Sequence, residues 1–155
     1  MITYVLDSNI IIKLLNDSPQ ILDLIENCQE LEYIVTNEVL MEVVNGENEP
    51  LSSLASPKYR KLMSHRRNAD FSSDGGREKT PFLVDKIDGK PVVLIGNRIT
   101  YIDLSSIIFC QNNPECTLVT NDKKMLKNSS KVLGKDRILN YNDFIEQLAS
   151  RGLFE

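Results

Sequence analysis

The sequence has few of the residues that build covalent catalytic sites or soft-metal sites. Its one histidine, His65, cannot form a multi-histidine metal site, and a Ser–His–Asp triad is disfavoured because it would depend on that single residue. The three cysteines, Cys28, Cys110 and Cys116, are odd in number and form no CxxC pair. This cysteine pattern argues against both a disulfide framework and a zinc cage.

Long apolar runs are also missing. No run approaches the roughly 20 residues of a membrane-spanning helix, and no Lys or Arg precedes the apolar N-terminal stretch as in a signal peptide. We therefore expect a cytoplasmic protein without a membrane segment. The 155 residues are 41% hydrophobic and 26% charged, as is typical of one globular domain, here spanning residues 1–155. The net charge of −4 does not favour a nucleic-acid partner, so the local distribution of basic residues matters more.

Short apolar segments alternate with amphipathic ones along the chain. This alternation predicts an α/β fold, a three-layer α/β/α sandwich around a mostly parallel sheet of four or five strands. The first segment is apolar at nearly every position, which indicates a strand buried on both faces. The expected strands are residues 2–6, 33–36, 117–120 and 137–139.

The middle of the chain departs from this alternation. An Asp-Gly pair between two apolar runs predicts a β-hairpin insertion around residues 82–95, in which Pro91 would restrict the second strand to a sheet edge. The polar stretch 64–81 is expected to form a loop, and residues 57–63 a helix. Ser8 or Asn9 is expected to cap the first helix, and Asn142 the last.

Four acidic residues occur at or near the positions where parallel sheets usually form functional sites. Asp7 and Asp122 follow expected strands, Glu42 lies on the helix after the second strand, and Asp103 lies in the first turn of the helix before residues 117–120. Because sites form at the carboxyl ends of parallel strands, we expect the four to converge. Clustered carboxylates repel one another unless cations neutralise them, and Mg²⁺ and Mn²⁺ prefer oxygen ligands. A Mg²⁺ or Mn²⁺ site is therefore expected.

Each acid taken alone also has a structural interpretation. Asp7, Asp103 and Asp122 can cap helices, and Glu42 can be a solvated helix position. Two other catalytic classes fit the spacing poorly. An aspartyl-nucleophile phosphatase would have a second acid where Asn9 stands, and a phosphorylated receiver domain would have a paired acid near its N-terminus.

Four motifs occur in an order that resembles a known family. VLDSNIII, NEVLMEVVNG, YIDLSSIIFC and LVTNDKKM together resemble a PIN-domain nuclease, and the compact length resembles the VapC-type toxins of prokaryotic toxin–antitoxin modules. The resemblance covers residues 1–46 and 99–148, whereas residues 47–98 depart from it. It implies Mg²⁺- or Mn²⁺-dependent endoribonuclease activity on RNA, with the family's four acids at Asp7, Glu42, Asp103 and Asp122. A homodimer and, for a toxin, a complex with an antitoxin protein are also implied.

Neighbouring polar residues complete the predicted site. Ser8, Asn9, Thr120 and Asn121 are expected to support the acids by hydrogen bonding. Basic residues are expected to contact RNA phosphates, the alternative being a solvated charged surface. These are Lys123, Lys124, Arg66 and Arg67. Two further functions stay open, a housekeeping RNA-processing nuclease and a non-catalytic PIN-like interaction module.

Overall fold

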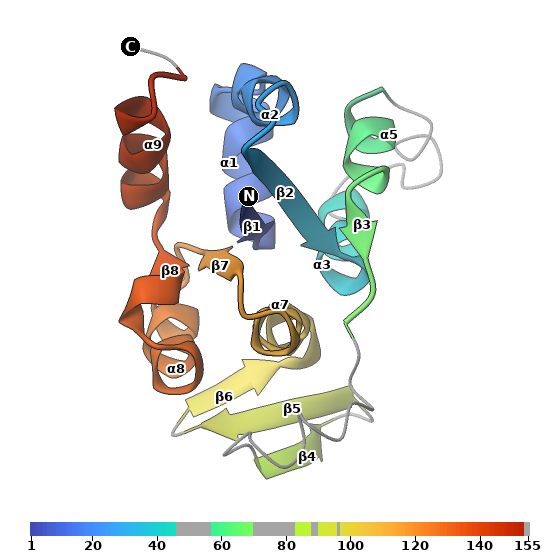
Figure 1. The fold of residues 1–155 in the computed structure, drawn as a ribbon. Coiled ribbons are helices and arrows are strands. Elements are labelled where there is room, and N and C mark those ends of the chain that lie inside the picture. The colour runs from blue at the N-terminus through green and yellow to red at the C-terminus, as the bar shows by residue number, and fades with distance from the viewer. Residues whose placement is uncertain (46–56, 70–82, 88–89, 96, 154–155) are drawn as a thin grey trace.

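The centre of the molecule is a five-stranded, wholly parallel sheet in the order β3-β2-β1-β7-β8 (Figure 1). The structure, a computed structural model, describes residues 1–45, 57–69, 83–87, 90–95 and 97–153. The central strand β1 pairs with β2 on one side and β7 on the other. The strands are β1 (Ile2–Leu6), β2 (Leu31–Thr36), β3 (Arg66–Arg67), β7 (Cys116–Val119) and β8 (Ile138–Leu139).

Helices cover both faces of this sheet. Tyr4 and Leu6 of β1 pack with α1, α2 and α9, whereas Val5 packs with α7 and α8. This alternation explains why the first strand is apolar at successive positions, and the predicted three-layer α/β/α sandwich is confirmed. The helices are α1 (Ser8–Asp17), α2 (Gln20–Glu26), α3 (Asn37–Asn45), α5 (Pro57–Met63), α7 (Tyr101–Asn112), α8 (Lys123–Leu133) and α9 (Tyr141–Ser150), with a 3-10 turn η1 (Lys135–Arg137).

A second, antiparallel sheet packs against α7 (Figure 1). Its strands are β4 (Leu83–Ile87), β5 (Lys90–Ile95) and β6 (Asn97–Thr100), and the antiparallel pairing of β4 with β5 confirms the predicted β-hairpin. The linking residues 88–89 lie outside the described residues. The expectation that Pro91 confines its strand to an edge was wrong, because β5 is central. Pro91 pairs only with Lys86 of β4, and pairing with β6 begins at Val92, so the β6 ladder needs no N–H from Pro91.

Local boundaries also differ from the predictions. Part of the expected loop 64–81 is strand β3, whose two arginines pair in register with the end of β2; residues 70–81 lie outside the described residues. Two exposed arginines show none of the apolar pattern that predicts a strand. They form a strand because their backbone pairs with the end of β2. Strand β2 begins at Leu31, and β7 ends at Val119.

The caps of the first and last helices differ in part from the predictions. Asp7, rather than Ser8 or Asn9, is the N-cap of α1, which confirms the structural interpretation of Asp7 as a helix cap. Asn140, rather than Asn142, is the N-cap of α9, and its Oδ1 accepts from Asp143 N at 2.8 Å. Asp7 directly follows β1, and Asn140 directly follows β8. Each helix therefore begins where the strand before it ends.

Within the described ranges, none of the helices combines the length and the apolarity needed to cross a bilayer.

Cys28, Cys110 and Cys116 are free thiols, as their number and spacing predict.

Candidate functional site

Asp7 lies buried at the carboxyl end of β1, with 1% of its surface exposed. Its backbone N–H donates to Val119 O at 3.0 Å, which extends the β1–β7 ladder by one residue and fixes the position of the side chain. Asp7 Oδ2 accepts from Thr120 Oγ1 at 2.7 Å, and Asp7 Oδ1 accepts from Ser8 N at 2.9 Å. The sheet therefore delivers a carboxylate into an interior position with two strong donors.

The electrostatic surroundings of Asp7 are unfavourable to its charge. Burial raises the pKa of this carboxyl, and repulsion from Glu42 and Asp122 raises the pKa further. The hydrogen bonds from Thr120 and Ser8 lower the pKa but do not cancel the rise. A cation beside Asp7 would favour the charged form and offset the cost of desolvation.

Thr120 connects Asp7 to Asp122. Its Oγ1 donates to Asp7 and accepts from Asp122 N at 3.2 Å. Asp122 is the N-cap of α8, because its Oδ1 accepts from Lys124 N at 2.8 Å and from Met125 N at 3.1 Å. The predicted capping by Asp122 is thus confirmed, and one hydroxyl holds both acids at this edge of the sheet.

The two aspartate caps differ in quality. Asp122 receives the second and third amides of its helix, which is the usual geometry of an N-cap. Among the backbone amides of α1, only the first, Ser8 N, donates to the Asp7 side chain. Capping therefore explains the position of Asp122 well, and explains less of the buried position of Asp7.

Asn9 and Asn121 tie the ends of three elements together. Asn121 N donates to Asn9 Oδ1 at 3.2 Å, and Tyr141 N donates to Asn121 Oδ1 at 2.8 Å. Asn9 Nδ2 also points to Asp7 Oδ2, at 3.5 Å. The predicted supporting residues Ser8, Asn9, Thr120 and Asn121 all make hydrogen bonds at this edge, although Ser8 does so through its backbone.

Glu42 lies on α3 and Asp103 on α7, and of the two only Glu42 acts on the pKa of Asp7. Glu42 is exposed and near enough to raise the pKa of Asp7. Asp103 is half-buried in the first turn of α7, two residues before Ser105, whose Oγ lies 2.7 Å from Thr36 Oγ1 at the end of β2. This buried hydroxyl pair holds the start of α7 at the carboxyl edge of the sheet.

The acids do not form a closed metal cage in the described structure. Among the residues it describes, no three His, Cys, Asp or Glu side chains lie close enough to hold one ion. Asp7, Glu42 and Asp122 are electrostatic neighbours nevertheless. The shared Mg²⁺ or Mn²⁺ site therefore stays a prediction.

Sequence reasoning missed some polar residues near the site. Glu38 lies one turn before Glu42 on α3, and its Oε2 is buried without a hydrogen-bond partner among the described residues. The signal was present, since residues four apart share one face of a helix. The Thr36–Ser105 pair had no such signal, because its members are 69 positions apart.

The predicted phosphate-binding residues are all exposed, at two places. Arg66 and Arg67 form β3, where Arg67 pairs in register with Thr36, and Arg66 Nη1 donates to Asn37 Oδ1 at 3.3 Å. Lys123 and Lys124 open α8, directly after Asp122. Both places are close to strand ends at the edge that carries Asp7.

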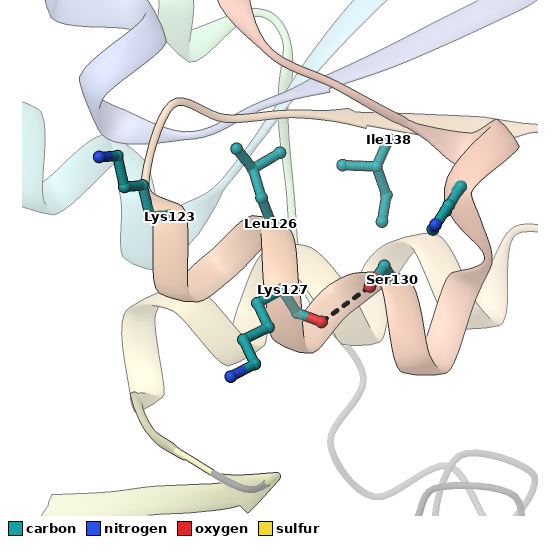
Figure 2. Close-up of a pocket in the computed structure, with 6 residues that line it drawn as sticks. Lys123, Leu126, Lys127, Ser130 and Ile138 are labelled. Carbon is teal, nitrogen blue, oxygen red and sulfur yellow. Dashed lines mark hydrogen bonds between the residues drawn. The ribbon is translucent and has the colours of Figure 1, made fainter.

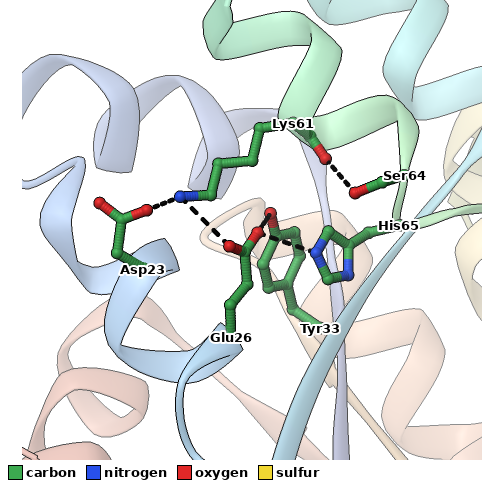
Figure 3. A network of polar contacts seen from close by, with 6 residues as sticks. All are labelled: Asp23, Glu26, Tyr33, Lys61, Ser64 and His65. Carbon is green, nitrogen blue, oxygen red and sulfur yellow. Dashed lines mark hydrogen bonds and ion pairs between the residues drawn. The ribbon is translucent and has the colours of Figure 1, made fainter.

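A separate polar network joins α2, β2 and α5 (Figure 3). Lys61 Nζ lies between Asp23 and Glu26, with Glu26 Oε2 at 3.2 Å. His65 Nε2 lies 2.8 Å from Glu26 Oε1, and the His65 ring stacks on Tyr33 with centroids 3.9 Å apart. The single histidine is thus engaged in a structural network.

The fold defined by these elements is a three-layer α/β/α sandwich with a parallel sheet. A solved structure that it resembles is that of PAE2754 from Pyrobaculum aerophilum, with 16% sequence identity and a TM-score of 0.54. The alignment covers 96% of this chain and 90% of that chain. At this identity the likeness shows the fold alone. No protein-family profile and no curated protein matches the chain.

Proposed function

We propose that the protein is a Mg²⁺- or Mn²⁺-dependent endoribonuclease that hydrolyses RNA phosphodiester bonds at a four-carboxylate site. The observation that carries this proposal is the buried Asp7 at the carboxyl end of β1, with its pKa raised by burial and by the nearby Glu42 and Asp122. A buried carboxylate among like charges is the arrangement that a divalent cation stabilises. The order of the four acidic motifs adds the resemblance to PIN-domain nucleases.

The available oxygen atoms suit a hard cation. Asp122 uses Oδ1 for capping, whereas no other described residue donates a hydrogen bond to its Oδ2. Glu42 is exposed and makes no ion pair with another described residue. Carboxylate oxygens of this kind are the ligands that Mg²⁺ and Mn²⁺ prefer. These donor atoms have the chemistry that such an ion needs, and the proposal requires the acids to come closer together than the described structure has them.

Each residue has a distinct role in the proposal. Asp7, Asp103 and Asp122 would hold the ion, and Glu42 would either complete the ligand set or orient the attacking water. The bound ion would lower the pKa of water and stabilise charge on the scissile phosphate. The 2.7 Å hydrogen bond from Thr120 orients Asp7 and favours its ionised form, because it lowers the pKa of the carboxyl.

The direct test is incubation of the purified chain with mixed, end-labelled RNAs in Mg²⁺, Mn²⁺ or EDTA. We expect cleavage with a divalent ion and none with EDTA. Asp7→Asn should abolish cleavage, whereas Asp17→Asn, which alters an exposed aspartate of the same helix, should retain it. Cleavage by Asp7→Asn at the wild-type rate would contradict the proposal.

The same experiment separates the proposal from a non-catalytic PIN-like module. A module that keeps its acids only as helix caps should neither cleave RNA nor gain thermal stability from Mn²⁺. A nuclease should gain stability, because the ion binds the folded state and not the unfolded chain.

The biological role and assembly are part of the same proposal. The resemblance to VapC-type toxins favours a homodimer that binds an antitoxin protein, with a housekeeping RNA-processing nuclease as the alternative. A toxin should arrest growth when expressed alone and be neutralised by the product of a neighbouring small gene. A housekeeping nuclease should not arrest growth.

A further inference from the structure

An open groove of about 440 Å³ runs beside α8 (Figure 2). Leu126 and Ile138 lie on one side of the helix and give the groove an aliphatic floor, while Lys123 and Lys127 extend outward (Figure 2). The residues that line it are Lys123, Leu126, Lys127, Ser130, Lys135 and Ile138. Three of these six residues are lysines.

Among the described residues, no acid forms an ion pair with the lysines of this groove. Lys123, Lys127 and Lys135 are exposed, and none of the three makes an ion pair or a side-chain hydrogen bond with another described residue. From residue 123 to residue 137 the only acid is Asp136. The whole chain has 22 acids against 18 bases, so this segment opposes the overall charge.

The one arginine of the segment has a different task. Arg137 Nε donates to Cys116 O at 3.1 Å, and Arg137 Nη2 donates to Asn113 O at 3.1 Å. It thereby fixes the turn between α7 and β7. The lysines have no comparable structural use, and like charges gathered on one helix are destabilising without a counter-charge.

The groove begins at the candidate site. Asp122 is the N-cap of α8, and Lys123 is its first residue. The helix has 11 residues, so it extends about 16 Å from the acids at a rise of about 1.5 Å per residue. An anionic chain bound at the acids through a cation would meet the lysines next.

We infer that this groove binds the sugar–phosphate backbone of RNA on one side of the cleaved bond. The inference rests on the proposed nuclease function and extends it from the acids to Lys127 and Lys135. Three lysines neutralise about three phosphates. None of the six lining residues is aromatic, so bases have no stacking platform there and the groove should bind with little sequence preference.

The test measures RNA binding separately from cleavage. Fluorescence anisotropy of a labelled single-stranded RNA is recorded in EDTA, at about 50 mM and about 200 mM salt, with wild type and with the triple variant Lys123→Gln/Lys127→Gln/Lys135→Gln. For single-stranded nucleic acid, each phosphate contact adds about 0.7 to the steepness of the plot of log binding constant against log salt concentration. The slope should therefore fall by about 2 in the triple variant, and the salt-induced weakening of Kd should shrink by about 20-fold.

Two matched variants make this result specific. Lys127→Gln should lower the slope by about 0.7, whereas Lys131→Gln, on the same helix but outside the groove, should leave the slope unchanged. The arginine triple Lys123→Arg/Lys127→Arg/Lys135→Arg keeps the charge and should keep wild-type binding. Thermal melting of every variant checks folding, and no variant should melt at a lower temperature than wild type, because the substituted positions are exposed and the glutamine variants remove like charges.

The outcomes separate this inference from the proposed function. Equal slopes for wild type and the glutamine triple would overturn the inference even if RNA is cleaved. A lowered slope without cleavage in Mn²⁺ would support the groove and contradict the nuclease activity. If a polyglutamate peptide at equal charge concentration displaced RNA, the inference that RNA is the ligand of the groove would be overturned in favour of an acidic protein segment.

Discussion

Two charged regions of this protein differ in whether their acidic and basic side chains pair with one another. In the network of α2, β2 and α5, Lys61 and His65 both contact Glu26, and Lys61 also contacts Asp23 (Figure 3). At the carboxyl edge of the sheet, by contrast, Asp7 has carboxylates as its charged neighbours, and the lysines of α8 have no acidic partner among the described residues. At this edge, the acids around Asp7 and the lysines of α8 are therefore separated rather than paired.

On the proposed function, the paired region is structural and the region of separated charges is the one that binds ligands. Paired charges satisfy one another and leave little for a ligand. Separated charges lower stability on their own and gain partners when a cation meets the acids and an anion meets the lysines. Breaking the paired region should thus affect stability alone, whereas breaking the separated region should affect activity.

The largest effect is expected from Asp7→Asn. The substitution keeps the shape and one acceptor oxygen but removes the charge that would hold the ion. RNA cleavage should be lost, while the melting temperature of metal-free protein should equal or exceed that of wild type, because a buried charge among like charges is removed. Cleavage assays and calorimetry check the two parts, and a lower melting temperature would favour a purely capping role for Asp7.

Thr120→Val should give the next largest effect. Valine matches threonine in shape but cannot donate to Asp7, and a hydrogen bond to a charged group contributes about 1.5–3 kcal/mol. At about 2–4 °C per kcal/mol for a chain of this size, the melting temperature at neutral pH should fall by several degrees. Cleavage should weaken as well. Thr117→Val, at a half-buried position of β7, the strand that Thr120 follows, is the matched control and should have little effect on either measurement.

A smaller effect is expected from Glu26→Gln in the paired network. The change removes the carboxylate shared by Lys61 and His65 but keeps an acceptor for the Tyr33 hydroxyl. These side chains are partly exposed, so the loss should be about 0.5–1 kcal/mol. Thermal unfolding measures this cost. RNA cleavage should be unchanged, and a large loss of cleavage would end the distinction between the two regions.

The smallest effect concerns pH. Because the pKa of Asp7 is raised on folding, its charged form destabilises the native state at neutral pH, and this penalty is relieved as pH falls through the folded-state pKa. Asp7→Asn lacks the penalty at every pH. Its advantage in melting temperature over metal-free wild type should therefore be largest near neutral pH and shrink as the solution is acidified. A constant or growing advantage on acidification would contradict the raised pKa.

The sequence by itself determined the alternation of elements and the placing of Asp7 and Asp122. Apolar segments of strand length specify buried parallel strands, and an acid after such a strand must lie at its carboxyl end. The hairpin also followed from a local signal, its Asp-Gly pair. Local pattern was sufficient in these cases because the physical cause lies within a few neighbouring residues.

Only the tertiary structure decided which distant groups meet. It made two exposed arginines a strand, placed the Thr120 hydroxyl between two acids, paired Thr36 with Ser105, and set Lys135 beside Lys123 and Lys127. It also left Pro91 in a central strand. These outcomes depend on backbone pairing and packing between segments far apart in the chain, and such interactions leave no periodic pattern in the sequence.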